Sequence, residues 1–196
     1  MPRLHTMHRP EAGITLISRW DTGTPERSRT AADTLLAGWP NRPAGELWQH
    51  IFIDLDGSGL LFYSQWTSAE AHLEFARSQR AAALQPVEEL VPGIERPGLN
   101  RTRLGPGVVP DAVRAAAVTS VGVLPGDEAV AAEAAAKLAG GPPPGLLAAH
   151  FHPTLDGSRV VVVSEWTDRT AQDAAPGFPG DGPETRWYRL FASVSR

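Results

Sequence analysis

One stretch of the sequence occurs twice, and this internal repeat constrains the fold more than any other feature. Residues 50–67 read HIFIDLDGSGLLFYSQWT, and residues 150–167 read HFHPTLDGSRVVVVSEWT. The two copies align without a gap and match at the leading His, at the Leu-Asp-Gly-Ser turn and at the closing Trp-Thr. A chain of 196 residues with such a repeat predicts two units of similar fold, each of about 100 residues.

The first half of the chain predicts the order β-α-β-β-α-β, which is the ferredoxin-like arrangement. Thr24 and Pro25 are typical of a helix start, and Asp56-Gly57 is typical of a hairpin turn. Thr67 and Glu70 form a predicted capping box for the second helix, which fades near residues 80–83 and is followed by a short helical turn at 86–90. The expected strands are 13–20, 46–54, 60–66 and 99–104.

The second half repeats this order with a shorter second helix. Pro176 and Gly177 limit the helix that begins near Thr167 to about two turns. The expected strands are 117–124, 145–154, 160–166 and 186–194, and the expected helices are 127–138 and 167–175. The predicted organisation is a disordered arm over 1–12, one unit over 13–105, a linker over 106–113 and a second unit over 114–196.

Composition narrows the classes of function. The net charge is −4 and the basic residues are scattered, which argues against a nucleic-acid partner. No apolar run reaches the roughly 18 residues needed to span a membrane, and the first residues do not form a signal peptide. The absence of cysteine excludes disulfides and thiolate metal sites and agrees with a cytoplasmic location. His5 and His8 lack a third ligand, so no metal site is expected.

With both halves placed, the chain resembles a tandem protein of antibiotic biosynthesis monooxygenase (ABM) domains. The resemblance rests on the element order, on the Leu-Asp-Gly turn, and on the strand endings Ser-Gln-Trp-Thr-Ser at 64–68 and Ser-Glu-Trp-Thr-Asp at 164–168. It implies an α+β fold in which two ferredoxin-like units pack sheet to sheet as an intramolecular dimeric α+β barrel, with further homo-oligomerisation left open. It also implies a ligand cavity inside each unit, between sheet and helices.

The resemblance implies a cofactor-independent monooxygenase that oxidises an aromatic, polyketide- or anthrone-type compound with O₂ and needs no metal, flavin or haem. One feature departs from the family. Its oxygenases commonly carry an Asn four residues before the third-strand Trp, and Phe62 and Val162 occupy those positions here. Two alternatives therefore stay open: a cyclase or isomerase of a similar substrate, and a non-catalytic ligand-binding or scaffold barrel.

Candidate site residues follow from the alternation of side chains along strands. Phe62 and Ser64 share a face with Trp66, and Val162 and Ser164 share a face with Trp166. As a hypothesis, we place His50, and with it Trp48 and Phe52, on the Trp66 face, and their counterparts His150 and His152 on the Trp166 face. The candidate catalytic residues are His150, His152, Trp166 and Arg189, and the candidate substrate-binding residues are Trp48, His50, Phe62, Ser64, Trp66, Ser164 and Trp187.

Each candidate also has a structural interpretation. The two repeated tryptophans anchor the strand–helix corner in this interpretation, the histidines are hydrogen-bonded core residues, and Arg189 forms a salt bridge. Tyr63 is expected to pack in the barrel seam, and His72 to be solvated on its helix. Because His150 and His152 lie two residues apart on one strand, we expect the site in the second repeat. Replacing His152 with Ala is then expected to be more harmful than replacing His72.

Overall fold

The structure is a computed structural model that describes residues 9, 11–38 and 43–195. These residues form two compact units. The N-terminal unit comprises residues 9–99 together with 190–195, and the C-terminal unit comprises residues 100–189. Outside the described residues lie 1–8 and 10, 39–42 and 196. The first of these ranges includes His5, His8 and most of the predicted arm.

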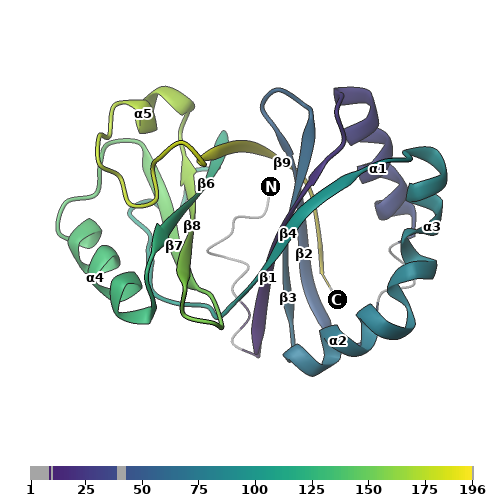
Figure 1. Cartoon of the computed structure of the whole chain (residues 1–196). Helices are drawn as coiled ribbons and strands as arrows, with labels where there is room; N and C mark the ends of the chain where they lie inside the picture. Colours follow the sequence, from purple (N-terminus) through teal and green to yellow (C-terminus); the bar gives the residue numbers. More distant parts are fainter. Residues whose placement is uncertain (1–8, 10, 39–42, 196) are drawn as a thin grey trace. The chain divides into compact units, whose positions relative to one another are not determined.

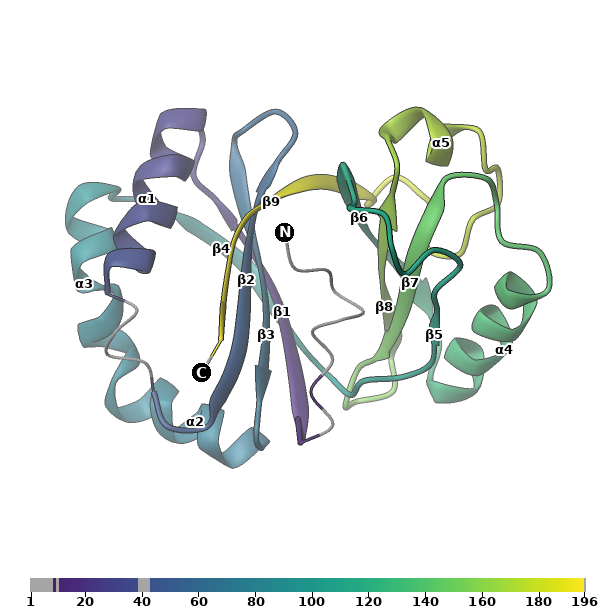
Figure 2. The same cartoon turned by 180° about the vertical axis from the view of Figure 1, so that it is seen from behind.

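The N-terminal unit is a sheet covered on one face by three helices (Figures 1 and 2). Its strand order is β4-β1-β3-β2-β9, with β3 antiparallel to both of its neighbours. All eight residues of β3 are buried. Its elements are β1 (Ile14–Asp21), α1 (Pro25–Ala37), β2 (Glu46–Asp54), β3 (Gly59–Trp66), α2 (Ala69–Ser78), α3 (Arg80–Leu90) and β4 (Glu95–Thr102).

The C-terminal unit repeats this plan with less helix. Its strand order is β9-β6-β8-β7-β5, and β8 is antiparallel to β6 and β7. The short strand β5 lies in the predicted linker and pairs with β7. Its elements are β5 (Gly107–Val108), β6 (Val118–Pro125), α4 (Glu128–Ala139), β7 (Leu146–Pro153), β8 (Arg159–Trp166), α5 (Arg169–Asp173) and β9 (Arg186–Ser195). The α+β class and the two ferredoxin-like element orders are confirmed.

The last strands of the two repeats, β4 and β9, are each divided between the two units. The sequence repeat did not indicate this division. In β9, residues 186–188 pair with β6 of the C-terminal unit, whereas residues 190–195 belong to the N-terminal unit. There the Trp48 indole N–H donates to the Ser193 hydroxyl at 2.8 Å. The unit boundaries therefore lie after Leu99 and after Arg189 rather than at the ends of the two halves.

Side-chain caps begin α1, α2, α4 and α5, whereas α3 has none, and one cap differs from the prediction. The Thr24 hydroxyl accepts from the Arg27 N–H, as expected for a helix with Pro at its first position. In α2 the cap is Ser68, whose hydroxyl accepts from the Ala71 N–H at 3.1 Å, and not Thr67. Thr67 follows the end of β3, and its own N–H donates to the Gly45 carbonyl at 2.8 Å.

The helical region after α2 is longer than predicted. α3 runs over all of Arg80–Leu90 and contains Pro86, where a short turn was expected. A proline inside a helix removes one backbone hydrogen bond. Val87 offsets this loss, because its side chain is 1% exposed and packs in the core below α1. Burial of Val87 in the core thus compensates for the proline inside the helix.

None of the helices within the described residues is long and apolar enough to cross a membrane. The longest of them, α1, has 13 residues, and a span needs about 20.

The two hairpin turns offer a matched pair of substitutions. Gly57 and Gly157 both have positive φ, at 82° and 69°, so alanine at either position costs about 1–2 kcal/mol of backbone strain. At Gly57 a Cβ would also lie 2.7–3.2 Å from Pro25, whereas at Gly157 the nearest atom is Asp127 Cβ at 4.0 Å. We expect Gly57→Ala to lower the free energy of unfolding more than Gly157→Ala, measured by urea denaturation. Equal losses would show that the Pro25 contact relaxes at no cost.

Candidate functional site

The candidate site is a cavity of about 690 Å³ inside the N-terminal unit. It lies between the sheet and the helices, and residues of β1, β2, β3, α1, α2, α3 and β4 line it. Its volume is within the range of about 300–1,000 Å³ that holds drug-sized ligands. The position between sheet and helices is the one that the family resemblance implies for a ligand cavity.

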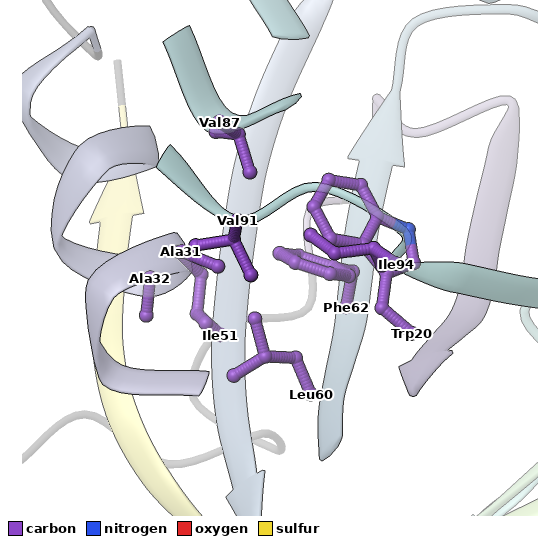
Figure 3. Packing of buried hydrophobic residues seen from close by; sticks show 9 residues of the cluster. All are labelled: Trp20, Ala31, Ala32, Ile51, Leu60, Phe62, Val87, Val91 and Ile94. Carbon is purple, nitrogen blue, oxygen red and sulfur yellow. The ribbon is translucent and has the colours of Figure 1, made fainter. Parts of the chain in front are cut away.

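Four aromatic rings form most of the apolar wall. Trp20 and Phe62 pack at 4.6 Å between ring centroids, and Trp66 and Phe75 pack at 5.4 Å. Figure 3 shows Trp20 and Phe62 beside each other, with Ile94 next to them. Flat aromatic walls of this kind stack favourably on planar rings. The cavity is therefore suited to a flat aromatic ligand.

Polar groups gather at the Trp66 end of the cavity. The Trp66 indole N–H donates to the Ser64 hydroxyl at 3.2 Å, and the His72 ring meets Trp66 edge-on at 5.2 Å between centroids. Gln49 pairs with Ser64 across the sheet, which places the Gln49 side chain on the same face. The apolar wall thus ends in hydroxyl, amide and imidazole groups that can bind the oxygen atoms of a ligand.

A β-bulge adds a carboxylate to this polar end. The pairing of β2 with β3 shifts between Glu46 and Trp48, so that Glu46 stands opposite Trp66. Glu46 is 4% exposed and lines the cavity. Without the bulge, Leu47 would take this place.

His72 occupies a different environment from the one predicted. Its side chain is 8% exposed and lines the cavity, whereas the sequence suggested a solvated position on α2. Because α2 begins directly after Trp66, the first turn of the helix folds back over the indole and brings His72 onto it.

The structure places Trp48, His50 and Phe52 on the sheet face opposite Trp66, so their predicted placement is wrong. Ile53 pairs with Leu60 across the hairpin, so residues of even number on β2 face residues of odd number on β3. His50 therefore pairs with Tyr63, and its ring lies 5.7 Å from that of Tyr63. The parity of the hairpin loop, which the sequence left open, decides the face.

His50 is a buried, neutral imidazole. It is fully buried among Trp48, Phe52 and Tyr63, and neither ring nitrogen has a hydrogen-bond partner among the described residues. Burial lowers the pKa of His50 from 6.5 to about 3. The same burial raises the pKa of Tyr63 above its usual range. These groups keep their uncharged forms near neutral pH.

This shift predicts an acid-dependent loss of stability. His50 binds a proton more tightly in the unfolded chain, so its contribution is complete above pH 6.5 and falls as the pH drops toward about 3. The slope from this one group is at most about 1.4 kcal/mol per pH unit. In His50→Gln, the free energy of unfolding should depend less steeply on pH in this window, measured by urea denaturation. Parallel curves for both proteins would contradict the assignment.

In the C-terminal unit, the chain itself fills the space that corresponds to the cavity. The segment after α5 folds back onto the sheet, and the Phe178 ring packs edge-on against Trp166 at 4.8 Å. Gly180 lies so close to β6 that a Cβ at Gly122 would be 1.9 Å from the Gly180 carbonyl oxygen. A Cβ at Gly180 would in turn meet Val162 at 3.0 Å. The counterpart of Gly122 in the N-terminal unit is Ser18, which lines the open cavity.

The C-terminal unit also differs from the cavity at three of its polar positions. The residues matching Glu46, Gln49 and His72 in the repeat are Leu146, Ala149 and Gln172. The Ser164 hydroxyl is shared with Ser120 at 2.7 Å and accepts from Trp166 at 3.0 Å. On β1, the residue opposite Ser64 is Leu16, which has no hydroxyl. The Ser164 and Ser120 hydroxyls bond each other, whereas the Ser64 hydroxyl has no hydroxyl partner on β1. Ser64 can therefore donate its hydrogen to a ligand.

Of the candidate residues of the second repeat, Ser164 contacts Trp166 and Trp187 lies on the same sheet face, whereas the two histidines do not. His150 and His152 pair with Val163 and Val161, so they lie on the opposite sheet face, with ring centroids 6.3 Å apart. Arg189 is exposed. The Arg169 guanidinium covers the Trp187 ring at 5.1 Å. Of the predicted residues, the cavity brings together Phe62, Ser64 and Trp66.

Several lining residues were not singled out from the sequence, although the repeat contains a signal for some of them. Glu46 and Gln49 are polar where the other copy is apolar, and such differences mark the unit with the open cavity. Trp20 and Arg96 come from β1 and β4, outside the strongly repeated stretch, so comparison of the copies does not point to them. Within residues 9, 11–38 and 43–195, no cluster of three metal-ligating side chains occurs.

Comparison with solved structures identifies the fold. No protein-family model matches the chain, and no curated protein matches it. An anthrone oxidase-like protein superposes with a TM-score of 0.68 at 19% identity, covering 93% of this chain and 92% of its own. A protein assigned as a monooxygenase from Lactobacillus acidophilus gives 0.56 at 10% identity, covering 93% and 96%. The chain has the fold of these monooxygenase-like proteins.

The same fold also carries other chemistry. A chlorite dismutase from Candidatus Nitrospira defluvii superposes with a TM-score of 0.57 at 10% identity, covering 98% of this chain and 96% of its own. At such identities the likeness extends to the fold alone, so function has to be argued from the cavity.

Proposed function

We propose that the chain is a cofactor-independent monooxygenase that binds a fused aromatic compound of the anthrone type in the N-terminal cavity and oxidises it with O₂. The observation that carries the proposal is the cavity itself, with aromatic walls and one polar end at Ser64, Trp66 and His72. The fold shared with an anthrone oxidase-like protein supports an anthrone as the first substrate to test.

The reaction balances without a redox cofactor. An anthrone CH₂ group loses a proton to a base and becomes a carbanion, which is stabilised by conjugation through the aromatic rings with the carbonyl on the opposite side of the central ring. The carbanion donates electrons to O₂ and forms a C–O bond as a peroxide. Loss of the second C–H proton with cleavage of the O–O bond yields the quinone carbonyl and one water. One O₂ is thus consumed for each CH₂ converted to C=O.

The residues at the polar end have the chemistry that these steps require. Imidazole is the side chain best suited to accept a proton near neutral pH, so His72 is the proposed base. The Ser64 hydroxyl, polarised by the Trp66 N–H, is placed to donate to the carbonyl oxygen as negative charge develops there. The apolar rings exclude water from the carbanion and peroxide.

Oxygen uptake tests the proposal. With an anthrone such as emodin anthrone, the protein should consume one O₂ per substrate at a rate well above spontaneous autoxidation, followed with an oxygen electrode and by quinone absorbance. Protein unfolded by heat serves as the control. An uptake rate equal to this control would refute the oxygenase function.

One observation favours a second function. Phe62 fills the position where related oxygenases place an amide, and it packs on Trp20 within the cavity wall. A binding protein, or a cyclase or isomerase of a similar aromatic compound, needs no such amide. If the anthrone quenches tryptophan fluorescence without consumption of O₂, these functions replace the oxygenase.

A further inference from the structure

Arg96 is a cationic side chain in the wall of the cavity. It lies on β4, and its guanidinium carbon is 4.4 Å from the centroid of the Trp20 ring. Its Nη2 donates to Glu88 Oε1 at 2.6 Å. The side chain is 25% exposed, so the guanidinium lies at the boundary between cavity and solvent.

The guanidinium has donors that the protein does not use. Arginine presents five N–H donors in a planar fork. Glu88 takes one of them, and the buried Nε has no hydrogen-bond partner among the described residues. A planar acceptor with two oxygen atoms matches such a fork by accepting two parallel hydrogen bonds. A carboxylate is an acceptor of this kind.

Arg96 and the polar end of the cavity lie far apart. Trp20, which Arg96 covers, pairs with Leu60 and packs on Phe62. Leu60 is four residues before Ser64 on β3, a separation of about 13 Å along the strand at about 3.3 Å per residue. A ligand with one end at Ser64 and the other at Arg96 therefore extends along the aromatic wall.

A purely structural interpretation of Arg96 is a salt bridge to Glu88. The Glu88 side chain is 44% exposed, and ion pairs at exposed positions contribute little to stability. That interpretation also leaves the buried Nε without an acceptor. The salt bridge and the contact with the Trp20 ring explain the position of the guanidinium and one of its donors, whereas an anionic ligand would supply acceptors for the remaining donors.

We propose that the cavity selects an aromatic acid, that is, a fused-ring compound whose carboxylate binds Arg96 while its other end lies at Ser64 and His72. The inference rests on the cavity assigned in the proposed function and adds the chemical class of the substrate. The carboxylate competes with Glu88 for Arg96, so Glu88 weakens the binding of acids.

Two probes of the same ring system test the proposal by binding alone. Anthraquinone-2-carboxylate carries the acid, and 2-(hydroxymethyl)anthraquinone is its uncharged counterpart. Their dissociation constants are measured on the full chain from the quenching of tryptophan fluorescence. We expect the acid to bind at least about tenfold more tightly, since that ratio corresponds to one charge-assisted pair of about 1.4 kcal/mol.

Three variants separate charge recognition from damage to the fold. Arg96→Gln should remove the preference for the acid and leave binding of the uncharged probe within a factor of about two. Glu88→Gln breaks the same salt bridge, yet it should tighten binding of the acid several-fold, because Arg96 then loses its competitor. Arg77→Gln removes an exposed cation of α2 outside the cavity and should change neither constant.

Equal affinities of the two probes in the wild-type chain, or parallel losses for both probes in Arg96→Gln, would overturn the inference. Weaker acid binding in Glu88→Gln would show that the salt bridge only supports the fold, which also overturns it. No probe requires turnover, so these outcomes are distinct from a failure of the oxygenase. If the protein consumes O₂ with an uncharged anthrone but shows no preference for acids, the proposed function holds and the inference about Arg96 is wrong.

Discussion

Replacing His72 with Ala should lower the turnover number for an anthrone by about 10²–10⁴-fold, the range that a positioned general base contributes. His72 is the imidazole that lines the cavity and meets Trp66, so its loss removes the proposed proton acceptor. The affinity for a non-reacting quinone, measured by fluorescence quenching, should change far less. The turnover number is obtained from oxygen uptake at saturating anthrone.

The repeat supplies the controls for this prediction. Gln172 is the buried counterpart of His72 in the C-terminal unit, and His152 lies on the sheet face opposite Trp166. Gln172→Ala and His152→Ala should both retain turnover within a few-fold, which reverses the ranking of His72 and His152 expected from the sequence. A larger loss in His152→Ala than in His72→Ala would move the proposed site to the second repeat.

Gly122→Ser should destabilise the C-terminal unit by about 1–3 kcal/mol or more, the usual cost of forcing atoms into a packed interior. The new Cβ would overlap the Gly180 carbonyl oxygen, at 1.9 Å, and that atom belongs to the backbone and has no rotamer to adopt. The segment that carries Gly180 must leave the sheet or the strand must bend. Urea denaturation measures the loss, and hydrogen exchange at residues 175–185 should increase first.

Gly141→Ser is the matched control, since a Cβ at that position meets no atom within 4 Å. It should change the free energy of unfolding by less than about 0.5 kcal/mol, as is usual for surface positions. If Gly122→Ser is as stable as this control, the segment after α5 does not hold its position against β6. In that case the C-terminal unit can open a cavity of its own, and the proposed asymmetry between the units is wrong.

Much of the local structure was predictable from sequence because its causes are local. The turn at Asp56-Gly57 needs a positive φ, and the caps at Thr24 and Asp127 satisfy N–H groups within the next three residues. The strand that ends at Trp66 was predicted as the return strand after this turn, and the alternation of side chains along it correctly placed Phe62 and Ser64 on the Trp66 face. These features depend on residues close together in the chain.

The parts of the site that the sequence did not predict depend on strand register and on packing between segments far apart in the chain. His50 was placed on the wrong face because the parity of a hairpin depends on its pairing, which the loop sequence did not reveal. Glu46 reaches the cavity through a bulge, and Arg96 reaches it from an edge strand. His72 was expected in solvent because the burial of a helix face depends on what it packs against.

By itself, the sequence determined the repeat, the order of the elements in both units and the turn chemistry, because periodicity and capping act within a few residues. Tertiary structure decided which copy keeps a cavity. In one unit the two helices after Trp66 stand over the sheet, and in the other a segment with Phe178 and Gly180 packs onto it. Two copies of one motif thus differ in whether they keep a cavity, because contacts between segments far apart in the chain fill this space in one unit and leave it open in the other.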